Sequence, residues 1–298
     1  MARILVTGAS GTVGTVVAAA LTAAGAQVRL AGRARPRPQQ HPGTPSVAFD
    51  FTDPATWGPT FQDVESVFLV RPPALGNVTR DLLPALAAAR DAGVRRVVFL
   101  SLQGAERNRV VPHATVEAWL RASGMRWTFV RASFFAQNLT TTHAADVRDR
   151  DEIVVPAGRG ATAFVDAADV GAVAAAALLD PASHADRAWT ITGPRALTYD
   201  EVADILAAEL GRPITYRRPS LARYANHARR SLHMPWAMVA VTSAIYTTAR
   251  LGLAAGLSDD VRTVLGREPI DVTEFAHRER AAWLAPGPPD PLGGKSGG

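Results

Sequence analysis

Residues 3–14 read RILVTGASGTVG, and this stretch decides the fold. A short apolar run leads into Gly8, Gly11 and Gly14, and a long segment rich in Ala, Val and Leu follows up to Gly25. This order predicts a strand, a glycine-rich turn and a helix. Glycine accepts positive φ and lets backbone amides approach a phosphate, while the following helix directs its positive end at the same point. We therefore expect the turn to bind a pyrophosphate, the alternative being a purely structural turn.

The glycine spacing is G-x-x-G-x-x-G and differs from the G-x-G-x-x-G of the better-known dinucleotide fingerprint. A glycine pattern alone is a weak indication. Its context strengthens it, because Val13, Val17 and Leu21 fall on one face of the helix that should follow. The combination of strand, turn and amphipathic helix favours a nucleotide site.

Composition limits the possible classes of protein. With 298 residues, of which 47% are hydrophobic, the chain is long enough for one large or two modest domains with a buried core. No cysteine occurs, so disulfides, thiolate chemistry and cysteine-ligated metals are excluded. No spacing of His, Asp or Glu indicates a metal site, and no G-x-S-x-G motif indicates a hydrolase. The first residues form a buried-strand pattern and not a signal peptide, so we expect a cytoplasmic protein.

Charge and hydropathy argue against two kinds of partner. The formal net charge is +5, but the basic residues are scattered and do not alternate with aromatic residues, so no nucleic-acid partner is expected. Residues 237–257 are the one membrane candidate. Arg250 leaves only thirteen residues before it, fewer than the roughly 18 to 20 that a span needs. We expect this segment to be a buried helix, and the protein to have no membrane partner.

The second strand carries a clue to the cofactor. Sites for NAD place an acid about 20 residues beyond the glycines, where it accepts a hydrogen bond from the ribose 2′-hydroxyl, whereas NADP sites carry arginine. Here Arg33 stands at the strand end, Arg35 and Arg37 follow, and no acid occurs before Asp50. A guanidinium pairs bidentately with a 2′-phosphate and stacks on adenine. The sequence therefore favours NADP, or NADPH when reduced, over NAD; a solvated loop is the alternative.

Strand and helix patterns alternate along the following residues. Strands are predicted at 46–53, 66–73, 95–102 and 126–135, with a helix at about 77–92 and a short strand and helix at 164–179. This rhythm predicts an α/β fold with a doubly wound parallel sheet, whose ligands collect at the carboxyl ends of the strands. The predicted ends are Thr7, Arg33, Asp50, Val70, Ser101 and Arg131. We expect Asp166 and Asp169 to cap the last helix.

Several segments together resemble a known family. They read TGASGTVG, AGRARP, FLVRPP, VVFLSLQGA, HATVEAWLRASGMRWTFVRASFFAQNL and FVDAADVGAVAAAAL, and a later portion includes ALTYDEVADILAAELGRPITY. The chain resembles, over nearly its whole length, the NmrA-like branch of the atypical short-chain dehydrogenase/reductases. The resemblance implies a Rossmann domain that binds NADP over residues 1–190 with parts of the later chain. It also implies a smaller, mostly helical substrate lobe over 191–285, and the composition of 286–298 predicts a disordered tail.

The proton relay of that superfamily is missing. Its Tyr-dependent members use a Y-x-x-x-K pair on the helix after the fifth strand, where one turn of helix brings the two side chains together. This chain has His113 and Glu117 at the same spacing, and its one lysine is Lys295. Glu117 would favour a protonated His113 that donates a proton to the substrate. The alternative is that His113 packs the helix start, while Glu117 faces solvent or a ribose hydroxyl.

The expected site residues follow from the turn, the strand ends and the resemblance. Cofactor contacts are expected from Thr7, Gly8, Ser10, Gly11, Thr12, Val13, Gly14, Arg33, Arg35, Asp50, Phe51, Val70, Arg71, Pro72, Ser101, Leu102, Ser133 and Phe134. Ser101 also has a possible catalytic role beside His113, orienting a substrate oxygen, with a plain turn residue as the alternative. Substrate contacts are expected from Phe135, Tyr224 and Trp236, with ordinary core packing as the alternative.

Three functions remain open. The first is an NADPH-dependent reductase of an apolar or aromatic carbonyl, enone or quinone. The second is a non-catalytic regulator that senses NADP, which the missing relay favours. The third is a non-redox cyclase or isomerase on the same scaffold. A small-molecule substrate and a monomer or homodimer are expected for the reductase.

Overall fold

The computed structural model describes residues 3–33 and 43–284. Their contacts divide the chain into two compact units. Unit 1 comprises Met1–Phe135, Ala163–Arg195 and Leu257–Asp271, and unit 2 comprises Ala136–Thr162, Ala196–Gly256 and Val272–Gly298. Residues 257–271 are a part of the later chain of the kind that the expected first domain included, whereas 136–162 fall in unit 2. The tail predicted to be disordered lies outside the described residues.

A seven-stranded sheet forms the centre of unit 1. Its order is β11-β6-β5-β4-β1-β2-β3, and every neighbouring pair is parallel. The strands are β1 (Arg3–Thr7), β2 (Gln27–Gly32), β3 (Ser46–Ala48), β4 (Val64–Val70), β5 (Arg96–Leu102), β6 (Arg126–Ala132) and β11 (Arg187–Ile191). All seven carboxyl ends therefore lie along one edge of the sheet, and the order reverses between β1 and β4, where such folds bind their ligands. The predicted doubly wound fold is confirmed.

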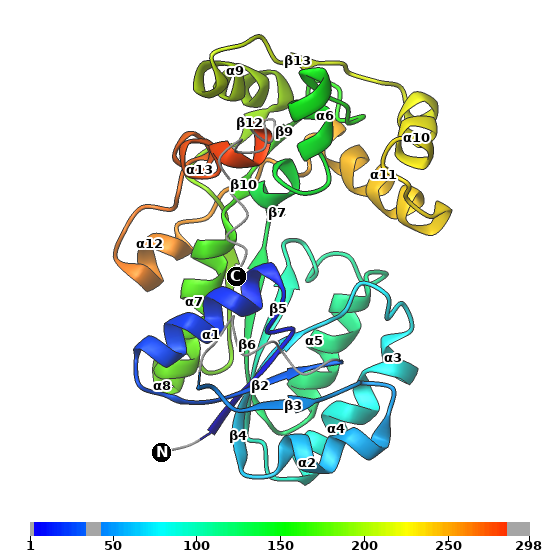
Figure 1. The fold of residues 1–298 in the computed structure, drawn as a ribbon. Coiled ribbons are helices and arrows are strands. Elements are labelled where there is room, and N and C mark those ends of the chain that lie inside the picture. Colours follow the sequence, from blue (N-terminus) through cyan, green and yellow to red (C-terminus); the bar gives the residue numbers. More distant parts are fainter. Residues whose placement is uncertain (1–2, 34–42, 285–298) are drawn as a thin grey trace, which may run out of the picture. The chain divides into compact units, whose positions relative to one another are not determined.

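Helices cover both faces of this sheet (Figure 1). On one face, Val6 packs with residues of α1 (Thr12–Ala23) and α7 (Ala167–Leu179). On the other face, Leu5 packs with residues of α4 (Leu83–Asp91) and α5 (Pro112–Ala122). Neighbouring strand residues thus serve opposite cores, which explains the continuous apolar strands of the sequence. The remaining elements are a 3₁₀ turn at Pro54–Thr56, α2 (Trp57–Phe61), α3 (Val78–Asp81), α8 (Pro181–His184), α12 (Asp260–Leu265) and the short pair β7 (Phe134–Phe135) with β10 (Phe164–Val165).

The strands predicted at 66–73 and 126–135 end earlier, at Val70 and Ala132, and two further elements differ more from their prediction. The helix predicted at 77–92 is divided into α3 and α4, because Pro84 in the first turn of α4 cannot donate a backbone hydrogen bond to continue a helix. The strand predicted at 46–53 ends at Ala48. Asp50 accepts hydrogen bonds from the backbone N and the hydroxyl of Thr52, at 2.8 and 2.7 Å, and this local turn replaces the strand ladder.

Unit 2 is mostly helical. It contains α6 (Ala144–Arg150), α9 (Tyr199–Leu210), α10 (Leu221–Arg230), α11 (Trp236–Arg250), α13 (Val272–Arg278) and 3₁₀ turns at Ala136–Leu139 and Arg280–Trp283. Two short strand pairs complete it, β8 (Glu152–Ile153) with β13 (Thr215–Tyr216) and β9 (Ala161–Thr162) with β12 (Leu197–Thr198). A capping box at Thr198 and Glu201 begins α9.

All four tyrosines of the chain are buried in unit 2. They contact one another in a chain, with ring centroids 5.5 Å apart for Tyr224 and Tyr246, 6.2 Å for Tyr246 and Tyr199, and 5.5 Å for Tyr199 and Tyr216. The buried His143 joins them, its Nε2 lying 2.6 Å from the Tyr246 hydroxyl. Burial raises the pKa values of these tyrosines, so all four hydroxyls stay protonated at neutral pH.

The structure corrects the prediction of a buried helix at 237–257. Of the fifteen residues of α11, Val239, Tyr246 and Ala249 are buried. Residues of the opposite face are exposed, including Val241 at 54% and Ile245 at 43%. The stretch is apolar on all sides, so its hydropathy could not indicate that only one side is covered. No helix among the described residues is long and apolar enough to cross a membrane.

Candidate functional site

The turn after β1 has the geometry of an anion cradle. Gly8 has φ of +62°, a conformation that favours glycine, and its carbonyl accepts a hydrogen bond from Gly11 N at 2.9 Å. A Cβ atom on Gly14 would overlap that same carbonyl group, so this position requires glycine. The first turn of α1 has no side-chain cap and no acidic residue. Its amide groups therefore face outward and carry the positive end of the helix dipole, which suits a pyrophosphate.

Thr7 holds the sheet together beside this turn. Its hydroxyl donates to the Phe68 carbonyl and accepts from Val70 N, both at 2.9 Å. These two bonds fix the end of β1 against the end of β4. The Thr7 side chain is buried in this role, and the exposed residues of the turn are Gly8, Ser10, Gly11 and Thr12.

The end of β2 presents a cation to solvent. Arg33 is exposed one residue after the strand. It lies near Asp50, whose pKa is lowered mainly by the hydrogen bonds from Thr52 and in smaller part by the Arg33 charge. Arg35 and Arg37 lie outside the described residues.

Phe51 is a core residue. Its ring is 7% exposed and meets Phe49 edge-on, with centroids 4.6 Å apart. The expectation that it offers a ring face at the crevice therefore conflicts with its packing. The sequence alone does not show whether an apolar residue after a short edge strand packs in the core or contacts a ligand.

Arg71 supports the loop after β4. Its guanidinium donates to the carbonyls of Pro72 and Leu75, both at 3.0 Å. Burial lowers the pKa of this arginine. These bonds hold the loop after β4 closed, and the Arg71 charge acts on His113.

A buried ionic cluster lies beneath α5 at the carboxyl ends of β5 and β6. Glu117, 1% exposed, accepts hydrogen bonds from the Ser101 hydroxyl at 2.7 Å and from Arg131 at 3.0 and 2.6 Å. Arg131 also pairs with Glu106 at 3.1 Å, and Arg121 lies 3.4 Å from Glu117. Bonding to Glu117 raises the pKa of Arg131. Glu117 therefore points to the sheet and away from solvent.

This cluster was only partly visible in the sequence. Ser101 and Arg131 were expected at one edge, but their link through Glu117 and the contribution of Glu106 were missed. The signal is an arginine inside an otherwise apolar strand, which needs a buried acid nearby. The Ser101 proton is directed at Glu117, so this hydroxyl offers other groups its acceptor lone pairs.

His113 lies at the start of α5, over the ring of Phe99, with centroids 5.8 Å apart and an angle of 26°. Its Nδ1 is buried and has no hydrogen-bond partner among the described residues. The pKa of His113 is lowered to about 4, mainly by burial and in smaller part by the Arg71 charge, while Glu117 opposes both with a smaller effect. The imidazole is neutral at pH 7. The expectation that Glu117 keeps it protonated is wrong, because desolvation is the larger effect.

The segment after β6 returns to the same edge. Ser133 N donates to the Ile191 carbonyl at 3.0 Å. Phe134 meets Phe164 edge-on at 5.6 Å, in the β7–β10 pair, and both Phe134 and Phe135 are partly exposed. Leu102, the last residue of β5, is also partly exposed at this edge.

The two acids at the start of α7 have different roles. Asp166 caps the helix, accepting from Ala168 N at 2.8 Å, as predicted. Asp169 does not. It is fully buried, pairs with Arg267 at 2.7 Å and accepts from Ile270 N at 2.7 Å, so it anchors the segment that follows α12. Sequence spacing cannot distinguish an acid that caps a helix from a buried acid three residues later that pairs with a distant segment.

The two expected substrate residues of unit 2 differ sharply in exposure. Tyr224 is fully buried and donates to the Thr242 hydroxyl at 2.9 Å, so it is a core residue. Trp236 is 65% exposed, and the Arg229 guanidinium lies 5.3 Å from its ring centroid.

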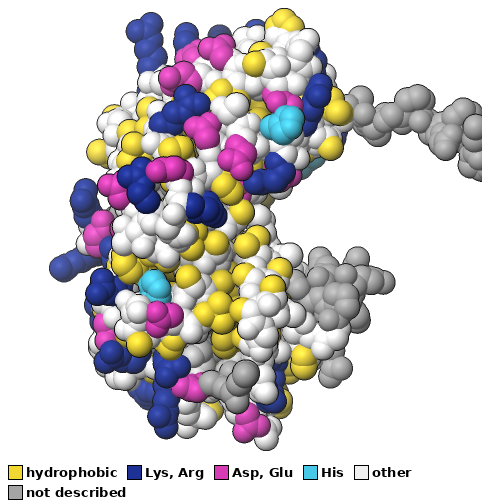
Figure 2. All heavy atoms as spheres, turned by 90° about the vertical axis from the view of Figure 1, so that its left-hand side faces the viewer, with side chains coloured by type: hydrophobic (Ala, Val, Ile, Leu, Met, Phe, Trp, Pro, Cys, Tyr) yellow, Lys and Arg dark blue, Asp and Glu magenta, His cyan; other side chains and the backbone are white. Residues whose placement is uncertain are grey.

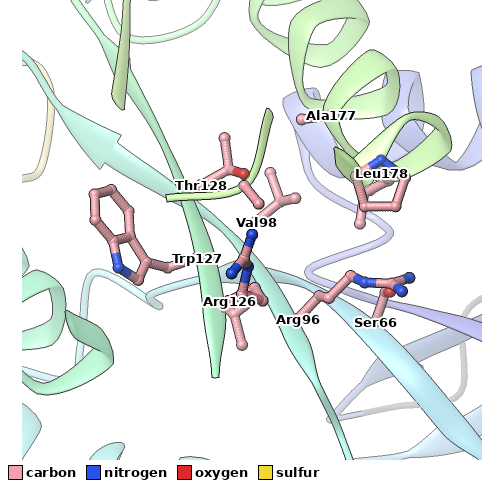
Figure 3. Close-up of a pocket in the computed structure, with 11 residues that line it drawn as sticks. Ser66, Arg96, Val98, Arg126, Trp127, Thr128, Ala177 and Leu178 are labelled. Atoms are coloured by element: carbon pink, nitrogen blue, oxygen red, sulfur yellow. The ribbon is translucent and has the colours of Figure 1, made fainter. Parts of the chain in front are cut away.

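A small pocket of unit 1 lies at the opposite edge of the sheet from the glycine turn. It is lined by the first residues of β5 and β6, by Ser66 and by the end of α7 (Figure 3). The two arginines at its mouth are already paired, Arg96 with Glu65 at 2.9 Å and Arg126 with Asp186 at 3.1 Å. It has no part in the candidate site.

Elsewhere on the surface, arginines and acidic side chains intermingle on the face shown in Figure 2.

Comparison with known proteins identifies the family. The model of the NmrA-like family matches residues 1–248. The chain belongs to the NmrA-like family. This membership agrees with the resemblance of its motifs and with the Rossmann sheet of unit 1.

Relatives of this NmrA-like chain include named reductases. An NAD(P)H azoreductase of Xenophilus azovorans is 34% identical over 293 residues, covering 95% of this chain and 99% of the relative. A (4-alkanoyl-5-oxo-2,5-dihydrofuran-3-yl)methyl phosphate reductase of Streptomyces griseus is 36% identical over 219 residues, 72% of this chain and 76% of the relative.

Solved structures share the fold of this NmrA-like chain. The NADPH-dependent quinone oxidoreductase of Escherichia coli, solved with NADPH, superposes with a TM-score of 0.81 at 23% identity, covering 92% of this chain and 99% of that one. The triphenylmethane reductase of Citrobacter sp., solved with NADP(H), gives 0.80 at 22% identity, covering 94% and 100%. At these identities the likeness concerns the fold.

Proposed function

We propose that this protein is an NADPH-dependent reductase of an apolar, conjugated small molecule. The observation that carries the proposal is the uncapped amino end of α1 beside the Gly8, Gly11 and Gly14 turn, where free backbone amides and the helix dipole suit a pyrophosphate. The turn, Ser10, Thr12 and Val13 would hold the diphosphate. The ends of β4, β5 and β6 would face the nicotinamide side, with Val70, Leu102 and Ser133 in contact.

Arg33 is the residue that would select NADPH over NADH. It is exposed at the end of β2, where an NAD site carries an acid. A 2′-phosphate there gains a bidentate charged hydrogen bond from the guanidinium. Asp50 lies near Arg33, and its carboxylate would repel the phosphate if it pointed at the same place. Its Oδ1 accepts both hydrogen bonds from Thr52 and is thereby directed away from that place.

The groups that could donate a proton limit the class of substrate that this protein would reduce. When bound, NADPH supplies a hydride, and reduction of a simple ketone also needs an acid to protonate the alkoxide. Unit 1 has no tyrosine among its described residues, and His113 is neutral at pH 7. The Ser101 hydroxyl donates its hydrogen bond to Glu117 and is not directed at a substrate. Acceptors whose reduced form is a stabilised anion, such as quinones or extended enones, can take their proton from water instead. The azoreductase name of one relative is consistent with conjugated acceptors.

A turnover panel tests this proposal. Purified protein would be mixed with NADPH and, separately, a soluble quinone, an azo compound, an enone and an aliphatic ketone, following loss of NADPH. We expect turnover with the conjugated acceptors and a rate about 10²–10⁴-fold lower with the ketone, the usual contribution of a general acid. NADPH binding without turnover of any acceptor would contradict the proposal and favour a regulator that senses NADP. Product formation without loss of NADPH would favour the isomerase alternative.

The variant His113→Gln distinguishes the two possible roles of this histidine, packing at the start of α5 and proton donation. If His113 only packs the start of α5, the rate with the quinone stays within about threefold and its dependence on pH between 6 and 9 is unchanged. A fall of about 10²-fold or more, with a changed pH profile, would make His113 the proton donor.

A further inference from the structure

One long segment of the chain has no acidic residue. Residues 211–258 contain seven arginines and no Asp or Glu, although the chain has 27 acids among its 298 residues. At that frequency a run of this length would contain about four acids by simple proportion. The segment includes all of α10 and α11 of unit 2.

Not all of these arginines are free. Arg212, Arg217 and Arg218 pair with acids outside the segment, namely Asp151, Glu152 and Asp200. The other four have no carboxylate within salt-bridge distance among the described residues, and they are Arg223, Arg229, Arg230 and Arg250. Three of the four are on α10, and the fourth ends α11. An excess of positive charge therefore remains on this part of unit 2.

The same part exposes an apolar surface. The uncovered side of α11 consists of Ala237, Ala240, Val241, Ala244, Ile245 and Thr248, at spacings of three and four residues. Trp236 at its start is 65% exposed, and Leu251 and Leu253 just after its end are 67% and 74% exposed. We call these residues the α11 face. Large contiguous apolar patches on soluble monomers usually mark a binding site.

We propose that the α11 face is a docking surface for an anionic lipid bilayer. A helix lying in the interface places apolar side chains among the lipid tails and cations at the phosphate level, with Trp favoured at the boundary. The guanidinium of Arg229 lies 5.3 Å from the ring centroid of Trp236. An aromatic ring and a cation are therefore neighbours at the start of α11. With fifteen residues, α11 is too short to span a bilayer, but it is long enough to lie on one.

The unpaired charges favour this occupant over a second copy of the chain. In a symmetric dimer the same patch meets itself, so the Arg229 charge beside Trp236 would face a patch that carries the same positive charge, in a segment without acids. Juxtaposed like charges weaken an interface. A bilayer containing anionic lipid provides the opposite charge instead, at about 1 kcal/mol for each basic residue near the surface.

Co-sedimentation with vesicles tests the proposal on the full chain. The probes are vesicles of phosphatidylcholine alone and of phosphatidylcholine mixed with phosphatidylglycerol. We expect binding to the mixed vesicles that is weakened by salt. Arg223→Gln with Arg230→Gln should lower the affinity by about 25-fold, fivefold for each arginine. Val241→Ser with Ile245→Ser should lower it by about tenfold or more.

Matched controls come from unit 1. Leu179→Ser changes an apolar side chain of similar exposure, 46%, and Arg107→Gln removes an arginine whose side chain is 88% exposed. Both should bind vesicles as the wild type does, and thermal unfolding checks that every variant is folded.

Three results would overturn the proposal. The wild type does not sediment with the mixed vesicles at low salt. The Val241/Ile245 variant binds as tightly as the wild type, so that overall basicity explains the binding. The wild type is a dimer in sedimentation velocity and this variant is a monomer, so that the α11 face joins two copies.

Discussion

Replacing Glu117 by Gln tests the buried cluster beneath α5. The carboxylate is 1% exposed and accepts hydrogen bonds from Ser101 and twice from Arg131, whose side chain is 9% exposed. Removing one member of a buried ion pair costs roughly 3–5 kcal/mol, because the other charge stays buried without its partner. We expect the lower end, about 3 kcal/mol, because Arg131 keeps Glu106 at 3.1 Å.

Thermal unfolding and NADPH titration measure the two consequences of this change separately. In a domain of roughly 150–250 residues, 1 kcal/mol shifts Tm by about 2–4 °C, so Glu117→Gln should lower Tm by about 6–12 °C. Well below that transition, the Kd for NADPH should stay within about twofold, because Glu117 points to the sheet. Arg121→Gln is the matched control, and its exposed partial contact is worth no more than about 1 kcal/mol. An unchanged Tm with a Kd raised tenfold would refute this reasoning and make Glu117 a cofactor ligand.

Two further predictions concern the turn and the buried histidines. Gly14→Ala should abolish NADPH binding in a titration, because the added Cβ overlaps the Gly8 carbonyl and displaces α1; unaltered affinity would contradict the cradle. His113 and His143 have folded pKa values of about 4, against about 6.5 when unfolded, so the unfolded chain binds more protons between these values. The free energy of unfolding should therefore fall as the pH drops from 6.5 to 4, by at most about 3 kcal/mol per histidine, and His113→Gln or His143→Gln should each remove part of that slope in chemical denaturation.

The sheet could be predicted from the sequence because its signals are local. Apolar strands, the glycine turn and the Ala-rich helices each follow from a few neighbouring residues, and their alternation fixes a parallel sheet. The family resemblance added the small lobe. The expected NADP site rests on the same local signals, Gly8, Gly11 and Gly14 with Arg33.

The features that could not be predicted from the sequence depend on burial by residues that are distant along the chain. The protonation of His113 is set by desolvation and by Arg71, which is far away in sequence and carries no local signal. Glu117 seemed equally suited to solvent, ribose or His113 until Arg131 was brought beneath it. The same holds for Tyr224, whose place in a tyrosine core required the fold of unit 2, and for α11, whose covered side depends on its neighbours.

The central claim is that the glycine turn and Arg33 form an NADPH site. Calorimetric titration of the wild type and of Arg33→Ala with NADPH and NADH tests it most directly. We expect the wild type to prefer NADPH by about 10-fold or more, the worth of a charged bidentate hydrogen bond, and Arg33→Ala to lose this preference while NADH affinity is unchanged. Equal affinity of the wild type for both cofactors, or an NADPH affinity that Arg33→Ala leaves intact, would contradict it.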